Sequence, residues 1–210
     1  MSEIKEVIEA VIAGEVEKVA ELTQELVDAG EKPQEIISQG LVGGMDVVGK
    51  RFKANEMFVP EVLIAAKAMH SGMDIVKPLL TDGESSSAGT IVIGTVEGDL
   101  HDIGKNLVAM MLEGAGFEVI DIGIDIPAAE FVEAVKENQP DIVGISALLT
   151  TTMPAMEETV QALEEAGVRE QVKIMVGGAP VSKDFADEIG ADGYAPDGST
   201  ATDLAREFIA

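Results

Sequence analysis

The stretch "GDLHDIGKNL", residues 98–107, holds one of only two histidines in the chain, with an aspartate two positions before it and another directly after it. A neutral imidazole is a good ligand for a first-row transition metal, and a carboxylate on its other nitrogen fixes the tautomer. Asp99 is spaced to be that carboxylate for His101. Alternatively, Asp99 or Asp102 caps a helix and His101 is a polar loop residue. Gly104 favours the ligand, because a missing side chain permits close approach by a bulky group.

Two further groups of small or polar residues follow apolar runs later in the chain. Ser146 ends one run, where a hydroxyl without a partner is costly to bury, so we expect it to bind the backbone or a ligand. Thr152, shortly before Pro154, also fits the N-cap of a helix with proline in its first turn. Gly177 and Gly178 follow the next run, and two successive glycines indicate either a tight turn or a ligand lying along bare backbone.

Short β-branched runs alternate with helix-length segments after Thr90. The runs are "TIVIGT", "FEVIDIG", "DIVGIS", "VKIMVGG" and the weaker "DGYA". This alternation predicts an α/β fold, a flavodoxin-like (Rossmann-like) doubly wound five-stranded parallel sheet with helices on both faces. Such sheets bind ligands outside the carboxyl ends of their strands. We therefore expect His101, Ser146 and the two glycines to lie along one edge of the sheet.

The first part of the chain has a different period. From Ser2 to about Leu80 apolar residues recur at helical spacing, glycines stand where two of the patterns stop, and prolines stand where two others begin. This pattern predicts an N-terminal four-helix bundle. The small, polar segment "TDGESSSAGT" after it is typical of a flexible tether. We expect a helical cap domain over residues 1–84, a tether over 85–90 and the α/β domain over 91–210.

Composition and missing motifs exclude several classes of protein. The formal charge of −25 opposes binding to nucleic acid or to anionic membranes, and the absence of cysteine excludes disulfides, iron–sulfur clusters and thiolate metal sites. We expect a cytoplasmic protein without a membrane span. The G-x-G-x-x-G and P-loop patterns are missing, and Ser146 stands where a phosphoacceptor receiver domain needs aspartate. His70 lies in the helical part, so the histidines do not form a zinc cluster.

Three motifs in order, Asp99-x-His101-x-x-Gly104, Ser146-x-Leu148 and Gly177-Gly178, resemble the cobalamin-binding domain of cobalamin-dependent methionine synthase, the acyl-CoA mutases and the corrinoid proteins of methyltransferase systems. A helical domain before it, with "RFKANEMFVPEVLIAAKAM" late in it, extends the resemblance to the whole chain and is similar to corrinoid methyl-carrier proteins. The mutases lack this cap domain.

The resemblance implies cobalamin bound base-off and His-on, with His101 as the lower ligand of cobalt and the nucleotide tail in a slot of the sheet domain. Asp99, with Ser146 or Thr152, would take up a proton when the imidazole detaches and release it on religation, so these four residues are the catalytic candidates. The cofactor-binding residues that the resemblance implies are Gly98, Asp99, Leu100, His101, Asp102, Ile103, Gly104, Ser146, Leu148, Thr150, Thr152, Gly177, Gly178, Tyr194 and Ala195.

The resemblance also assigns a role to the helical domain, which would cover the upper face of the corrin and move aside for methyl transfer. Phe52, Met57, Phe58 and Val59 are the candidate cap residues, although apolar residues at helical spacing fit the bundle core equally well. Shortening the tether should then impair methyl transfer and leave corrinoid binding intact.

The implied function is a methyl carrier that cycles between Co(I) and methyl-Co(III), with methylcobalamin as the charged state. Its partners would be a substrate-specific methyltransferase, a second methyltransferase directed to tetrahydrofolate or a thiol such as coenzyme M, and a reductive activase. The chain has no substrate barrel and would not be a complete catalyst alone. Methanol, methylamines, betaines and aryl methyl ethers remain open as donors. The alternatives are a cobalamin-sensing regulatory protein, disfavoured by the acidic N-terminus, and a mutase subunit.

Overall fold

The computed structural model describes residues 2–80 and 87–210 of the chain and divides into two compact units. The first consists of Met1–Ala88 with Glu113–Gly116, and the second of Gly89–Leu112 with Phe117–Ala210. Residues 81–86, which include the first two residues of the predicted tether over 85–90, lie outside the described residues. No helix in the described part of the chain combines the length and the apolar character needed to cross a membrane.

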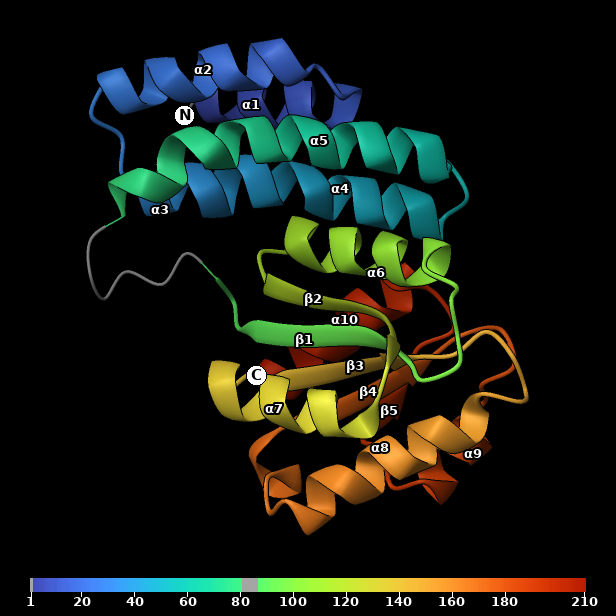
Figure 1. Cartoon of the computed structure of the whole chain (residues 1–210). Helices are drawn as coiled ribbons and strands as arrows, with labels where there is room; N and C mark the ends of the chain where they lie inside the picture. The colour runs from blue at the N-terminus through green and yellow to red at the C-terminus, as the bar shows by residue number, and fades with distance from the viewer. Residues whose placement is uncertain (1, 81–86) are drawn as a thin grey trace. The chain divides into compact units, whose positions relative to one another are not determined.

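The helical unit confirms the predicted bundle. A short helix, a π-helical stretch and a longer helix follow one another without a break, so the described residues of this unit form four helical rods (Figure 1). Gly14 and Gly30 end the first two rods with φ values of 71° and 82°, which glycine adopts without strain. The elements are α1 (Ser2–Ala13), α2 (Val16–Asp28), α3 (Pro33–Glu35), η1 (Ile36–Leu41), α4 (Val42–Lys53), α5 (Val59–Val76) and η2 (Lys77–Leu79).

The four candidate cap residues differ in exposure. Met57 is buried, as expected of a residue in the bundle core, and Phe52 is half-buried. Phe58 and Val59, at the start of α5, are 63% and 37% exposed. Leu63 and Ile64, one turn further along α5, are also exposed and were not among the candidates. Bundle packing therefore accounts for Met57 and leaves a group of apolar side chains on α5 exposed.

The α/β unit has the predicted fold class. All strand pairs are parallel, and the order β2-β1-β3-β4-β5 is that of flavodoxin-like sheets. Helices α6 and α10 lie on one face, and α7 and α8 lie on the other (Figure 1). The elements are β1 (Thr90–Val96), α6 (Ile103–Gly114), β2 (Glu118–Ile126), α7 (Ala128–Asn138), β3 (Ile142–Ser146), α8 (Met153–Glu165), η3 (Arg169–Gln171), β4 (Lys173–Gly177), α9 (Lys183–Glu188), β5 (Gly193–Tyr194) and α10 (Gly198–Ile209).

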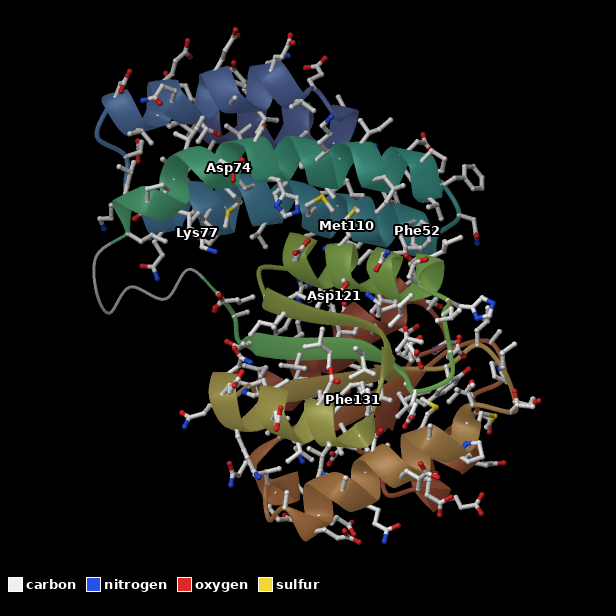
Figure 2. All side chains as sticks on the ribbon, viewed as in Figure 1. Phe52, Asp74, Lys77, Met110, Asp121 and Phe131 are labelled. Atoms are coloured by element: carbon white, nitrogen blue, oxygen red, sulfur yellow. The ribbon has the colours of Figure 1, made fainter. Side chains whose placement is uncertain are left out.

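The register of the sheet brings the three predicted motifs to one edge. Thr95 of β1 pairs with Ser146 of β3, which pairs with Gly177 of β4. The core beneath this edge is aliphatic apart from Phe131 of α7, which is fully buried against the sheet (Figure 2). The loops that follow β1, β3 and β4 therefore start side by side on a rigid support.

Candidate functional site

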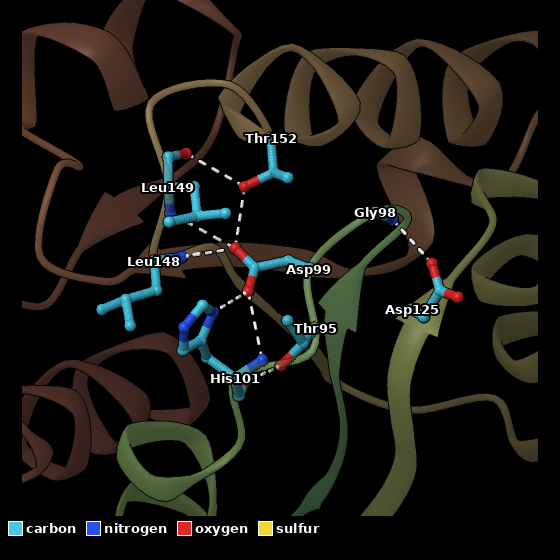
Figure 3. Close-up of polar contacts among 8 residues, drawn as sticks. All are labelled: Thr95, Gly98, Asp99, His101, Asp125, Leu148, Leu149 and Thr152. Carbon is cyan, nitrogen blue, oxygen red and sulfur yellow. Dashed lines mark hydrogen bonds and ion pairs between the residues drawn. The ribbon is translucent and has the colours of Figure 1, made fainter.

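The loop between β1 and α6 presents His101 with one ring nitrogen engaged and the other free. Nδ1 lies 2.6 Å from Oδ1 of Asp99, whose side chain is fully buried, while the side chain of His101 is 49% exposed (Figure 3). An ionised carboxylate only accepts hydrogen bonds, so Nδ1 carries the proton that it donates. Nε2 then keeps its lone pair, and it has no partner among the described residues. The ring is therefore set up as a metal ligand.

The second carboxylate oxygen of Asp99 is held by the loop after β3. Oδ2 accepts hydrogen bonds from the backbone N–H of Leu148 at 2.7 Å and of Leu149 at 3.3 Å, and from the hydroxyl of Thr152 at 2.7 Å. Burial by itself raises the pKa of Asp99, but the hydrogen bonds from Leu148, Thr152 and His101 outweigh burial and hold the pKa well below its usual value. Asp99 therefore stays ionised and keeps the imidazole in one tautomer.

Backbone contacts fix the rest of the loop. The hydroxyl of the buried Thr95 donates to the carbonyl oxygen of His101 at 3.0 Å, and the N–H of His101 donates to Oδ1 of Asp99 at 3.1 Å. The N–H of Gly98 donates to Oδ1 of Asp125 at 2.6 Å. The sequence did not reveal the roles of Thr95 and Asp125, although only the Asp125 contact crosses from one strand to the loop after another. A hydroxyl inside the apolar run "TIVIGT" was the available signal for Thr95.

The start of α6 is tied to the neighbouring strand by a further contact that sequence analysis missed. The side chain of Lys105 is almost completely buried and forms an ion pair with Asp121 of β2. Its ammonium also donates to the side-chain oxygen of Asn106 at 2.7 Å. Because α6 begins directly after the His101 loop, this pair holds the far end of the loop against β2.

The predicted polar residues after β3 do not all join the network. Thr152 stands at the N-cap of α8 but makes no capping bond, because its hydroxyl lies between Asp99 and the carbonyl oxygen of Leu149. Of the two hydroxyls that the sequence offered, only that of Thr152 is hydrogen-bonded to Asp99. Ser146 is half-buried, and its hydroxyl has no partner within the described part of the chain. Thr150 is exposed and lies outside the network.

Internal packing explains the two glycines after β4. A Cβ atom at Gly177 would lie 2.8 Å from the carbonyl oxygen of Ala195, and one at Gly178 would overlap the carbonyl oxygen of Ala147. Gly178 also has a φ of 127°, which disfavours any side chain. The protein's own backbone thus requires both glycines, whether or not a ligand lies beside them. Of the two predicted contacts at β5, Tyr194 is half-buried and Ala195 is buried.

The surroundings of His101 are apolar and open. A Cβ atom at Gly104 would meet no other atom within 4 Å, so the space above the start of α6 is free. Large apolar side chains are exposed on the loop after β1, at the start of α6 and on the loop after β3, where a protein surface normally carries polar side chains. They are Leu100 at 67%, Ile103 at 84%, Leu148 at 42% and Leu149 at 41%. An apolar ligand would remove these side chains from water.

Any metal bound to His101 must bring its other ligands with it. In residues 2–80 and 87–210, no group of three or more histidine, aspartate or glutamate side chains is arranged to hold a metal ion. A single imidazole inside an apolar rim instead fits a metal held in a flat macrocycle, which needs one axial protein ligand and apolar contacts for the ring. The residues present therefore fit a corrinoid, whose cobalt is held in this way.

Comparison with known proteins agrees with this geometry. A family model described as a B12 binding domain matches residues 89–203, and a second B12 binding domain model matches residues 3–77. Trimethylamine corrinoid protein 1 of Methanosarcina acetivorans is 49% identical over 92% of this chain and 89% of that protein. Dimethylamine corrinoid protein 1 of the same organism is 50% identical over 85% of this chain and 84% of that protein.

A solved structure matches over almost the whole chain. It is a chain in the methanol:cobalamin methyltransferase complex MtaBC of Methanosarcina barkeri, with a TM-score of 0.90, 33% identity and coverage of 99% of this chain and 80% of that chain. The protein therefore belongs to the B12-binding corrinoid proteins, with a helical cap domain followed by an α/β domain. The predicted family, fold class and corrinoid cofactor are confirmed at this level.

Proposed function

We propose that the protein carries a methyl group on a bound corrinoid. It would receive this methyl group from one methyltransferase and deliver it to another. The observation that carries this proposal is the free Nε2 of His101, aimed outward by a buried carboxylate and surrounded by exposed apolar side chains. Corrinoid cobalt supplies the chemistry, because it accepts and gives up a methyl group. The protein supplies the ligand, the apolar support and the control of one proton.

His101 would hold the corrinoid base-off and His-on through Nε2. Asp99 would keep the imidazole in the correct tautomer, and it would hold the proton on Nδ1 while the ring binds or leaves the metal. The hydroxyl of Thr152, 2.7 Å from Asp99, can stabilise the carboxylate or turn to Leu149, so it adjusts the basicity of the pair. Ser146, Gly177 and the other residues that the resemblance implies would line the nucleotide slot.

The helical unit would shield the upper face of the corrin. Four apolar side chains at the start of α5 are exposed and suit this role: Phe58, Val59, Leu63 and Ile64. Their exposure supports the role because the bundle itself does not bury them. Met57 packs in the bundle instead.

Names of relatives favour methylamines as the source of the methyl group. Two relatives that are about half identical are a trimethylamine and a dimethylamine corrinoid protein, and a solved relative forms a complex for methanol:cobalamin methyl transfer. We therefore propose a substrate-specific methyltransferase as the first partner, with a methylamine as its substrate. A second methyltransferase would pass the methyl group to tetrahydrofolate or to a thiol such as coenzyme M.

The visible spectrum of the protein reconstituted with hydroxocobalamin tests the proposal. We expect the wild type to retain the corrinoid after desalting, with the spectrum of a base-off, histidine-ligated form, and His101→Ala to lose the histidine-ligated signature. His70→Ala is the matched control, since it removes the only other histidine and should leave the spectrum unchanged. A wild type that is colourless after desalting, or an unchanged spectrum in His101→Ala, would contradict the proposal.

A further inference from the structure

We propose that Asp125 is a positioning residue that holds the metal-binding loop between β1 and α6 in place for axial ligation, an inference that rests on the proposed function. Asp125 lies near the end of β2, which pairs with β1. Gly94 pairs with Gly123, whereas Val96 pairs with Ile126, so β2 contains one residue more than β1 over this stretch. Such a bulge beside a functional site changes where a side chain points, and here it lies beside the loop.

Asp125 contacts the loop through two different groups. Its Oδ1 accepts the hydrogen bond from the N–H of Gly98 at 2.6 Å (Figure 3), and its own N–H donates to the carbonyl oxygen of Asp99 at 3.1 Å. The carboxylate of Asp99 is held separately by Leu148 and Thr152. Asp99 is therefore fixed at its carbonyl group from β2 and at its carboxylate from the loop after β3.

This double attachment matters because Asp99 orients the imidazole. If the backbone of Asp99 moves while its carboxylate stays bound, the distance and angle to Nδ1 of His101 change, and the direction of Nε2 changes with them. A ligand that must leave the metal and bind it again benefits from a loop that keeps its geometry when the bond is broken. Asp125 supplies that support from the β2 side.

The backbone conformation of Asp125 supports a specific role. Its φ is 56°, and only Asn55 and Gln139 are other non-glycine residues with positive φ in the described part of the chain. Gln139 is the C-cap of α7 and Asn55 follows the C-cap of α4, positions where this conformation is common. Asp125 lies inside a strand, so no helix end explains it. A strained conformation persists only where its surroundings hold it, and such residues cluster at functional sites.

Two substitutions of Asp125 and one control separate the hydrogen bond from the backbone strain. Asp125→Gly keeps the left-handed conformation without strain and removes the acceptor for Gly98, whereas Asp125→Asn keeps a neutral acceptor and tolerates the conformation. Gln139→Gly is the matched control, because it makes the same backbone change at the end of α7. We would measure the visible spectrum of the full chain with hydroxocobalamin, and the exchange rate of the Gly98 N–H in the corrinoid-free protein.

We expect Asp125→Gly to lower the ratio of histidine-ligated to unligated corrinoid about fivefold and to speed exchange at Gly98 by a similar factor, the effect of losing one exposed hydrogen bond. Asp125→Asn should restore both, and Gln139→Gly should change neither. Normal ligation in Asp125→Gly overturns the inference while His101→Ala still loses ligation, so the proposed function stands. An equal loss in Asp125→Asn and Asp125→Gly also overturns it. An unchanged spectrum in His101→Ala refutes the proposed function and this inference together.

Discussion

The two ends of the parallel sheet each hold an aspartate with a lowered pKa, and they use it in opposite ways. At the carboxyl ends of the strands, Asp99 is surrounded by donors and leaves Nε2 of His101 free. At the amino ends, Asp192 accepts from the N–H of Ile174 at 2.8 Å and pairs with Arg169 at 2.8 Å and Lys173 at 3.2 Å. These three charged side chains pair with one another, so none of them offers a free atom to a ligand.

A shifted pKa therefore does not by itself identify a functional site. Partial burial raises the pKa of Asp192, but the N–H of Ile174 and the cations Lys173 and Arg169 outweigh it, so the net shift is downward as it is for Asp99. Arg169 also donates to the carbonyl oxygen of Gly190 at 2.6 Å. The carboxyl ends of the strands, the functional end in our proposal, differ instead in two features. Nε2 of His101 has no partner among the described residues, and apolar side chains stay exposed.

Removing the carboxylate at the functional end should have the largest effect. Asp99→Ala leaves the Leu148 and Leu149 N–H groups and Nδ1 of His101 without their acceptor, so we expect the free energy of unfolding to fall by about 3 kcal/mol and histidine ligation of the corrinoid to be lost. Urea denaturation and the visible spectrum measure the two effects. Glu97→Ala, an exposed carboxylate on the same loop, should change stability by less than about 0.5 kcal/mol. If Asp99→Ala were stable and still showed histidine ligation, Asp99 at the carboxyl ends of the strands would have no special role compared with Asp192 at the amino ends.

Substitution at the structural end should affect stability alone. Asp192→Asn should lower the free energy of unfolding by about 1 to 2 kcal/mol at pH 7 and leave corrinoid binding unchanged. Because the folded protein lowers the pKa of Asp192, its stabilisation is complete above the unfolded value near 4 and is lost as the pH falls below it. The difference between variant and wild type should therefore shrink in acid, which denaturant titrations from pH 7 to pH 3 would measure. A loss of corrinoid affinity in this variant would mean that the amino ends also serve the site.

An apolar residue on the rim of the site should show the smallest effect, on affinity rather than stability. Ile103 is 84% exposed, so Ile103→Ser should change the free energy of unfolding by less than about 0.5 kcal/mol. If Ile103 contacts the corrin ring as proposed, losing that contact should weaken corrinoid binding about fivefold, as measured by titration of absorbance. Ile209→Ser, which changes an exposed isoleucine of α10 near the amino ends, is the control and should keep full affinity. Equal affinities for wild type and Ile103→Ser would argue against the proposal that the exposed apolar side chains around His101 contact the corrinoid.

Local signals in the sequence were sufficient for the architecture and for the central pair of the site. The change of hydrophobic period near Thr90 predicted a helical bundle before an α/β domain, because the period follows directly from helix and strand geometry. The spacing of Asp99 and His101 allowed the contact that the structure shows, because a carboxylate two residues away on the same loop can reach the ring nitrogen. For Gly177 and Gly178 the sequence predicted a tight turn or a ligand along bare backbone, but not the close packing of Ala195 and Ala147 against them.

Contacts that cross between strands were beyond the sequence. Thr152 had the pattern of a helix cap, yet its hydroxyl bonds Asp99, and Ser146, the alternative, has no partner among the described residues. Asp125 carried no local pattern that pointed to the loop it holds, and Thr95 was signalled only by a hydroxyl in an apolar run. The contacts of Thr152 and Asp125 depend on which loops and strands the strand order places side by side.

The sequence by itself thus determined the two kinds of domain, the order of their elements and the His101–Asp99 pair, since these depend on residues close together in the chain. The tertiary structure decided which hydroxyl reaches the buried carboxylate, which nitrogen of His101 stays free and which apolar side chains remain exposed. The physical reason is that hydrogen bonds and burial are set by neighbours in space, and the parallel sheet brings β1, β2 and β3 together from distant parts of the chain.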